Sequence, residues 1–195
     1  MNIAVFASGG GTDFQSIIDG VESGLIKAKI NMLIASKPDI YAIERAKKHN
    51  IPHYVFCKKD FFSGEEMFDN IIKLLDENKT DLIVLAGYLT ILAPNIVKAY
   101  EGRIINIHPA LLPKFGGVGM YGMNVHEAVI AAGEKESGCT VHYVDTGADT
   151  GKIIAQARVT VEATDTPESL QKKVLEKEHE LLPRVVAQLI EENRR

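Results

Sequence analysis

The sequence predicts an α/β fold, a doubly wound and mostly parallel sheet of the Rossmann-like kind, in a single domain over residues 1–195. Short apolar runs alternate with segments of helical periodicity as far as residue 107, which is typical of parallel strands joined by helices. The run over 81–86 is apolar after its first residue, as in a strand buried on both faces. A chain of 195 residues that is 46% hydrophobic can build one substantial core.

The first half of the chain alternates strands and helices. The expected strands are 2–7, 28–35, 51–56 and 81–86; the expected helices follow the glycines at 9–11, cover 40–48 and follow Ser63. Ser63 and Glu66 fit a capping box for the last of these helices, whose apolar face begins at Met67 and Phe68. We expect Met67 and the aromatic residues to be core rather than ligand contacts.

The second half predicts a strand ending near His108, a glycine-rich mobile loop at 116–122 and a short helix at 125–132. Strands are expected at 140–144 and 153–161, joined by a turn-prone stretch at 145–151. Thr166 and Pro167 have the residue types of N-cap and N1, so they begin the last helix, which Pro183 should kink or divide.

Asn106 and His108 are the first candidates for chemistry. They lie two residues apart on a predicted strand, so their side chains point to the same face. Pro109 ends the strand there, which predicts that the imidazole meets solvent at the edge where ligands of open α/β sheets bind. The alternative is that both side chains only cap the strand end.

Gly9, Gly10 and Gly11 form a second candidate site, because a glycine turn before a helix presents free N–H groups to a phosphate. A dinucleotide fingerprint would need glycine where Phe14 stands, and no Gly-Lys-Ser/Thr of a Walker loop follows. A phosphate monoester is therefore the first expected ligand. A tight turn without a ligand is the alternative.

Glu178 falls on the apolar stripe of the last helix, where a carboxylate is costly unless it is paired. It either meets a neighbouring base such as Lys173 or His179, or faces a ligand.

The overall charge excludes several classes of function. The net charge is −4 and no basic block is present, which disfavours nucleic acid and anionic membranes as partners. No basic and apolar leader follows Met1, so a cytoplasmic protein is expected. Cys57 and Cys139 make no disulfide framework, and no Cys/His cluster has metal-site spacing.

Five stretches together resemble the phosphoribosylglycinamide formyltransferases, a group of folate-dependent formyltransferases in purine synthesis. They are Gly9–Gly11, Gly87–Leu92, Asn106-Ile-His108-Pro, Gly138-Cys-Thr-Val-His142 and Asp149-Thr-Gly151. The resemblance covers nearly the whole chain. It implies transfer of the formyl group of 10-formyltetrahydrofolate to the amine of 5-phosphoribosylglycinamide, without a metal.

The resemblance also implies roles for individual residues. Asn106, His108 and Asp149 would form the catalytic group; Gly11, Thr12 and Asp13 would hold the substrate phosphate; Asn106 and Glu178 would contact the glycinamide substrate. The folate would be held by Leu85, Leu89, Thr90, Ile91, Leu92, Val97, Ile104, Asn106, Thr146, Gly147, Ala148 and Asp149. Thr12-Asp13 departs from the Ser-Asn of the best-known members and brings a negative charge near a dianion.

The chemistry of formyl transfer also follows from the residue types. Asn106 and protonated His108 can donate hydrogen bonds to an oxyanion, and Asp149 can hold His108 charged and relay protons. A formyltetrahydrofolate hydrolase would use a similar group with water as acceptor. A methionyl-tRNA formyltransferase would need a basic surface and a further domain, and a binding module could keep the fold without the chemistry.

Overall fold

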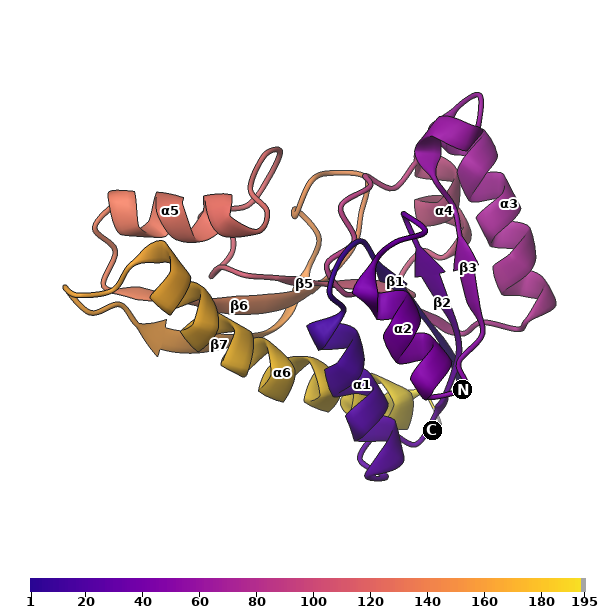
Figure 1. Cartoon of the computed structure of the whole chain (residues 1–195), viewed down its shortest axis with the longest axis horizontal. Helices are drawn as coiled ribbons and strands as arrows, with labels where there is room; N and C mark the ends of the chain where they lie inside the picture. The colour runs from indigo at the N-terminus through magenta and orange to yellow at the C-terminus, as the bar shows by residue number, and fades with distance from the viewer. Residues whose placement is uncertain (194–195) are drawn as a thin grey trace.

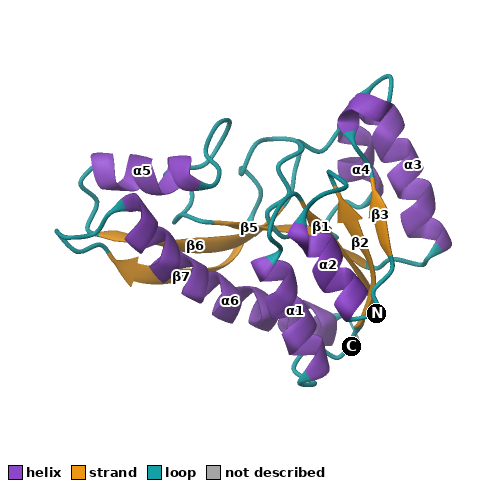
Figure 2. Cartoon of the chain, in the orientation of Figure 1, coloured by secondary structure: helices purple, strands orange, loops and turns teal. Residues whose placement is uncertain are grey.

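Seven strands form one sheet in the order β3-β2-β1-β4-β5-β6-β7, in the computed structural model, which describes residues 1–193 (Figures 1 and 2). Strands β1 to β5 pair in parallel, whereas β6 pairs antiparallel with both β5 and β7. The strands are β1 (Asn2–Ala7), β2 (Lys29–Ala35), β3 (His53–Val55), β4 (Leu82–Leu85), β5 (Ile104–His108), β6 (Glu136–Tyr143) and β7 (Ile153–Thr160). The predicted mostly parallel sheet is confirmed.

Helices cover both faces of this sheet, so two hydrophobic cores form. Apolar residues of α1, α2 and α6 fill one core, while α3 and α4 fill the other; α5 packs on α6. The helices are α1 (Thr12–Glu22), α2 (Tyr41–Lys48), α3 (Gly64–Glu77), α4 (Pro94–Ala99), α5 (Met123–Ala131) and α6 (Pro167–Glu192), with a single 3₁₀ turn at Lys58–Asp60. Met67 and Phe68 are fully buried, as predicted.

The strand order reverses between β1 and β4, which is where open α/β sheets form a ligand crevice. The glycine turn after β1 and the loop after β4 leave the sheet side by side at this point. Ser8 joins them, since its N–H donates to the Gly87 carbonyl at 3.0 Å and its hydroxyl accepts from the Leu89 N–H at 2.9 Å.

Helix caps agree with the sequence in one case and differ in another. Thr166 begins α6 with a complete capping box, in which Ser169 is the partner. Ser63 accepts from the Glu66 N–H at 3.0 Å, but the Glu66 carboxylate accepts from the Phe62 N–H, so the predicted reciprocal box is not formed. The carboxylate reaches one residue further back than expected.

Helix α6 runs through Pro183 without division, so that part of the prediction was wrong. Pro183 is buried against Gly20 of α1. A Cβ built on Gly20 would lie 3.4 Å from the Cβ of Pro183. Tight packing of α6 against α1 offsets the backbone hydrogen bond that proline removes.

Candidate active site

Asn106, His108 and Asp149, predicted as one group, meet at the carboxyl end of β5. The side chains of Asn106 and His108 share one face of β5, and Asp149 lies on the loop between β6 and β7. His108 Nδ1 is 3.5 Å from Asp149 Oδ2. Asp149 has a φ of 58°, a left-handed conformation that is uncommon outside glycine and is found at functional sites.

His142 joins this group, although we assigned it no role from the sequence. The β5–β6 register places it directly opposite Asn106, and its Nε2 lies 3.1 Å from Asn106 Nδ2 and 3.6 Å from Asp149 Oδ1. Its Nδ1 lies 2.8 Å from the Tyr143 carbonyl and donates to it. In the neutral ring Nε2 accepts from the Asn106 amide, whereas in the protonated ring Nε2–H can donate to Asp149. The sequence signal for this role was that His142 is a polar side chain within a predicted apolar strand.

The carboxylate of Asp149 therefore lies between two imidazoles. Burial alone would raise its pKa, but contacts with His142 and the Gly117 N–H, and the charge of His108, hold that pKa below its ordinary value. The pKa of His108 is lowered, because burial outweighs the opposing charge of Asp149. We had expected Asp149 to keep His108 charged, and in this arrangement burial prevails.

The loop at 114–122 covers this group. His108 Nε2 donates to the Phe115 carbonyl at 2.8 Å, and the Gly117 N–H donates to Asp149 Oδ2 at 3.0 Å. His108 is only 3% exposed, so the predicted solvent-facing imidazole was wrong. The chain after Pro109 folds back over the strand end instead of leaving it.

Thr140 explains why the chain folds back. Its hydroxyl donates to the Ala110 carbonyl at 2.6 Å and accepts from the Leu112 N–H at 3.1 Å. Thr140 also pairs with His108 across the β5–β6 register, so a buried side chain on β6 anchors the loop beside the imidazole.

The glycine turn after β1 needs glycine for a packing reason as well. Gly11 is the N-cap of α1 with a φ of 70°, and a Cβ there would lie 2.8 Å from Ala42 Cβ. A Cβ at Gly9 or Gly10, by contrast, would have no atom within 4 Å. Gly10 and its neighbours thus border open space at the positive end of α1.

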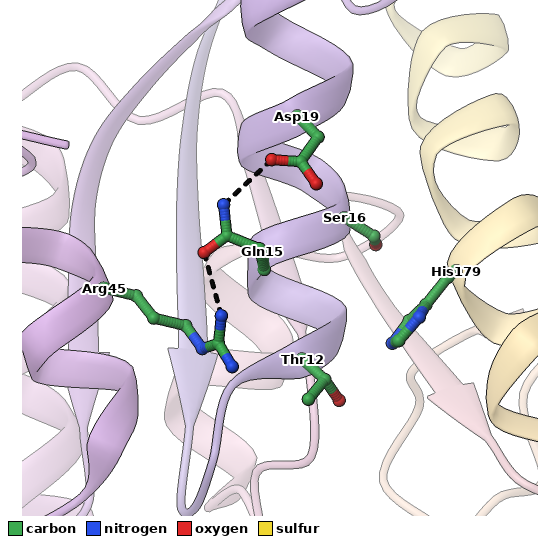
Figure 3. Close-up of a pocket in the computed structure, with 6 residues that line it drawn as sticks. All are labelled: Thr12, Gln15, Ser16, Asp19, Arg45 and His179. Carbon is green, nitrogen blue, oxygen red and sulfur yellow. Dashed lines mark hydrogen bonds between the residues drawn. The ribbon is translucent and has the colours of Figure 1, made fainter. Parts of the chain in front are cut away.

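A pocket of about 310 Å³ flanks the first turns of α1 (Figure 3). Figure 3 shows Arg45 of α2 on one side of α1 and His179 of α6 on the other, two bases that the sequence did not assign to a site. Arg45 is anchored by hydrogen bonds to the Gly10 carbonyl at 2.8 Å and to Gln15 Oε1 at 3.0 Å. Besides Arg45 and His179, the pocket is lined by Thr12, Gln15, Ser16 and Asp19.

Glu178 points into the contact between α6 and α1 and is 7% exposed. Neither expected base pairs with it: Lys173 bonds Asp165 at 2.6 Å, and His179 Nε2 lies 3.7 Å from Asp13 Oδ1. Burial, and then the charge of Asp13, raises the pKa of Glu178 well above its usual range. Of the two predicted alternatives, pairing with a base is therefore not found.

Some of the residues that the resemblance links to folate are exposed on loops, and others are buried beneath them. Leu89 and Ile91 are 56% and 79% exposed in the loop after β4, where apolar side chains could cover a flat ring. Leu85, Val97 and Ile104 are buried beneath this edge. Thr146, Gly147 and Ala148 are exposed in a turn that Asp145 holds by accepting from the Gly147 N–H at 2.9 Å.

Among the described residues, no group of three or more His, Cys, Asp or Glu side chains could hold a metal ion. In the same part of the chain, no helix is both long and apolar enough to span a bilayer.

The fold and this group define a Rossmann-like α/β protein with an acid–base group at its strand ends and a glycine turn beside it. The chain matches the formyl transferase family model over residues 1–186, and it belongs to that family. The resemblance found in the sequence is thereby confirmed.

Individual relatives carry a more specific name. A chloroplastic phosphoribosylglycinamide formyltransferase of Arabidopsis thaliana is 43% identical over 97% of this chain, which spans 65% of that protein. The Haemophilus influenzae phosphoribosylglycinamide formyltransferase is 43% identical over 94% of the chain and 84% of its own length. The crystal structure of the Bacillus halodurans enzyme of that name superposes with a TM-score of 0.92 at 40% identity, covering 97% of this chain and 95% of its own.

Proposed function

We propose that this protein transfers the formyl group of 10-formyltetrahydrofolate to the glycyl amine of 5-phosphoribosylglycinamide, in purine biosynthesis. The observation that carries the proposal is Asp149 held between His108 and His142, with Asn106 bonded to the same network. This arrangement combines hydrogen-bond donors with a proton acceptor, which acyl transfer to an amine requires.

The reaction forms a bond between the acceptor amine and the formyl carbon and breaks the bond from that carbon to the folate nitrogen. Asn106 Nδ2 carries two hydrogens, of which His142 takes one, so the other can donate to the oxyanion. His108 supplies the second donor. Asp149 accepts the proton of the attacking amine, directly or through water, and the leaving nitrogen takes up a proton.

The loop at 114–122 has to move before His108 can donate to a substrate. Both ring nitrogens face acceptors, Phe115 O at 2.8 Å and Asp149 Oδ2 at 3.5 Å. A formyl oxygen must therefore replace the Phe115 carbonyl. The left-handed φ of 55° at Phe115 and the glycines that follow make this segment suited to such a change.

The acceptor and the folate would occupy opposite sides of this group. The N–H groups of Gly11, Thr12 and Asp13 are at the amino end of α1 and suit the phosphate, and Glu178 suits the glycinamide moiety. The exposed side chains of Leu89 and Ile91 suit the pterin, with Thr90, Leu92 and the turn at 146–149 around it, above Leu85, Val97 and Ile104. Both partners in this proposal are small molecules, and the cytoplasm is the expected compartment.

The decisive experiment measures deformylation of 10-formyltetrahydrofolate with and without 5-phosphoribosylglycinamide. We expect a rise of at least ~100-fold on adding the acceptor, about 2.7 kcal/mol of barrier, with the formyl group recovered on the glycyl amine. Formate released at the same rate without acceptor would indicate a hydrolase. Tight binding of either ligand without turnover would leave only a binding module.

A further inference from the structure

Asp13, on the first turn of α1, is a carboxyl group without a hydrogen-bonding partner for one oxygen. Its Oδ1 is buried and accepts no hydrogen bond within the described residues. The basic atom paired with it is His179 Nε2 at 3.7 Å, beyond hydrogen-bonding distance, and that nitrogen is itself buried without a partner. The side chain of Asp13 is 13% exposed.

Glu178 is the second carboxyl group at this contact between α1 and α6. It is 7% exposed, and in the part of the chain that the structure describes it makes no hydrogen bond or ion pair. It lies close enough to Asp13 that the charge of Asp13, added to burial, raises its pKa well above the usual range. Two ionised carboxylates side by side repel, so this contact favours the protonated form of Glu178.

The other titratable groups around the pair do not neutralise Asp13. Burial, then the charges of Glu178 and Asp13, raise the pKa of the Cys139 thiol on β6 to about 12, so it stays neutral. Burial, then the charge of Arg45, lowers the pKa of His179, while Asp19 acts in the opposite direction. The ammonium group of Lys177 bonds Glu180 at 2.9 Å.

An ionised Asp13 and a bound phosphate would compete for the same positive end of α1. The helix dipole and the free N–H groups of its first turn stabilise one nearby anion, but a dianion beside a buried carboxylate adds repulsion in a poorly screened place. Neutral Asp13, by contrast, has a hydroxyl group that can donate a hydrogen bond.

We propose that Asp13 takes up a proton when a phosphate group binds at the first turn of α1, so that this carboxyl makes the acceptor site sensitive to pH. The inference rests on the proposed function, since it assigns the acceptor phosphate to this turn. The proton comes from solvent.

The size of the effect follows from the titration of the free protein. Burial raises the pKa of Asp13 to about 6, so at pH 7 most molecules carry it ionised. Binding at pH 7 should then take up more than about half a proton per site, and the Kd should rise up to ~10-fold from pH 7 to pH 8.

Calorimetric titration with 5-phosphoribosylglycinamide, in two pH 7 buffers of different ionisation enthalpy, measures this proton uptake. The wild type should take up at least about half a proton more than Asp13→Asn, a difference in which ionisation of the ligand itself cancels. Asp13→Asn should also lose the weakening of up to ~10-fold between pH 7 and pH 8. Thermal shift with inorganic phosphate over the same pH range gives the same comparison without turnover.

Two further variants serve as controls. Glu178→Gln should keep the proton uptake, because the proposal assigns that uptake to Asp13. Glu22→Gln, which removes an exposed carboxylate from the other end of α1, should match the wild type. Equal uptake in the wild type and Asp13→Asn would overturn the inference, as would the absence of phosphate binding between pH 5.5 and 8. Phosphate binding with the expected difference, in a protein that fails to transfer formyl groups, would uphold it while refuting the proposed reaction.

Discussion

The two proposed sites differ in how their polar groups are paired. We call them the catalytic edge, formed by Asn106, His108, His142 and Asp149, and the acceptor cradle, formed by Gly9–Asp13 and Glu178. At the catalytic edge the polar groups contact each other or the backbone of neighbouring segments. In the acceptor cradle Asp13 Oδ1 has no hydrogen-bonding partner, and none reaches Glu178 within the described residues. The polar groups of one region are paired within the protein, whereas the other region holds carboxyl groups that lack such partners.

This difference has an energetic consequence. A buried polar group without a partner costs roughly 1–3 kcal/mol, so the acceptor cradle lowers stability, and in the proposed function the bound acceptor supplies the missing contacts. The catalytic edge carries no such deficit, although in the proposed reaction the Phe115 carbonyl must first release His108. Changes at the catalytic edge should therefore lower kcat, and changes in the acceptor cradle should raise the KM of the acceptor.

The largest effect is expected from His108→Ala, which removes a donor to the oxyanion. We expect kcat to fall by ~10³-fold or more. Because His108 is buried and bonded to Phe115, the variant should also lose roughly 1–3 kcal/mol of stability, so a thermal melt must accompany the rate measurement. His53→Ala, on the edge strand β3, is the matched control and should retain normal turnover. Retention of a tenth or more of wild-type kcat by His108→Ala would contradict the assignment.

Asp149→Asn should lower kcat by ~10²-fold, because an amide cannot accept the proton of the attacking amine. The charge of Asp149 favours imidazolium, so its loss should lower the pKa of His108 further, which an NMR titration of the ring protons would show. Activity that depends on protonated His108 should then fall off at lower pH than in the wild type. An unchanged titration of His108 would mean that the two groups are not coupled.

The same variant predicts a change in stability with pH. The folded-state pKa of Asp149 is depressed, so its contribution is present above the unfolded pKa of 3.8 and is lost as pH falls through the folded value. The stability difference between the wild type and Asp149→Asn should therefore shrink on acidification below pH 3.8. A difference that stays constant across this range in urea titrations would refute the coupling.

Gly10→Val tests the acceptor cradle without disturbing the fold. A Cβ at Gly10 would have no atom within 4 Å, so stability should change by less than ~0.5 kcal/mol while the KM of the acceptor rises ~10-fold. Gly11→Val, by contrast, combines a φ of 70° with a contact to Ala42 and should cost roughly 1–3 kcal/mol. Equal changes in the KM of acceptor and folate in Gly10→Val would place the phosphate elsewhere.

Ser8→Ala should have the smallest kinetic effect, because the Ser8 hydroxyl bonds only the Leu89 N–H and the Ser36 hydroxyl, which donates to it at 2.8 Å. Without its hydroxyl the Leu89 N–H loses its partner, so the KM of the folate should rise a few-fold and stability should fall by about 1 kcal/mol. Ser63→Ala, which removes the N-cap of α3, should cost a similar stability but leave both KM values unchanged. A change in the KM of the folate in Ser63→Ala would show that lost stability alone explains the KM change in both variants.

The sequence by itself determined the fold class, the order of strands and helices, and the family. These follow from local properties of the chain: apolar runs predict β1 to β5, Thr166 begins α6, and the two-residue spacing of Asn106 and His108 puts both on one face. Local patterns predict the sheet and its helices because each element folds so as to bury its own apolar face.

The tertiary structure alone decided which side chains meet. His142 contacts Asn106 because of the β5–β6 register, and Phe115 reaches His108 because Thr140 anchors the returning loop. Asp13 and Glu178, near opposite ends of the sequence, are neighbours only because α6 packs along α1. Periodicity within a segment carries no information on strand register or on packing between distant segments. Register and packing decide which groups become neighbours, and the pKa and exposure of each side chain depend on those neighbours.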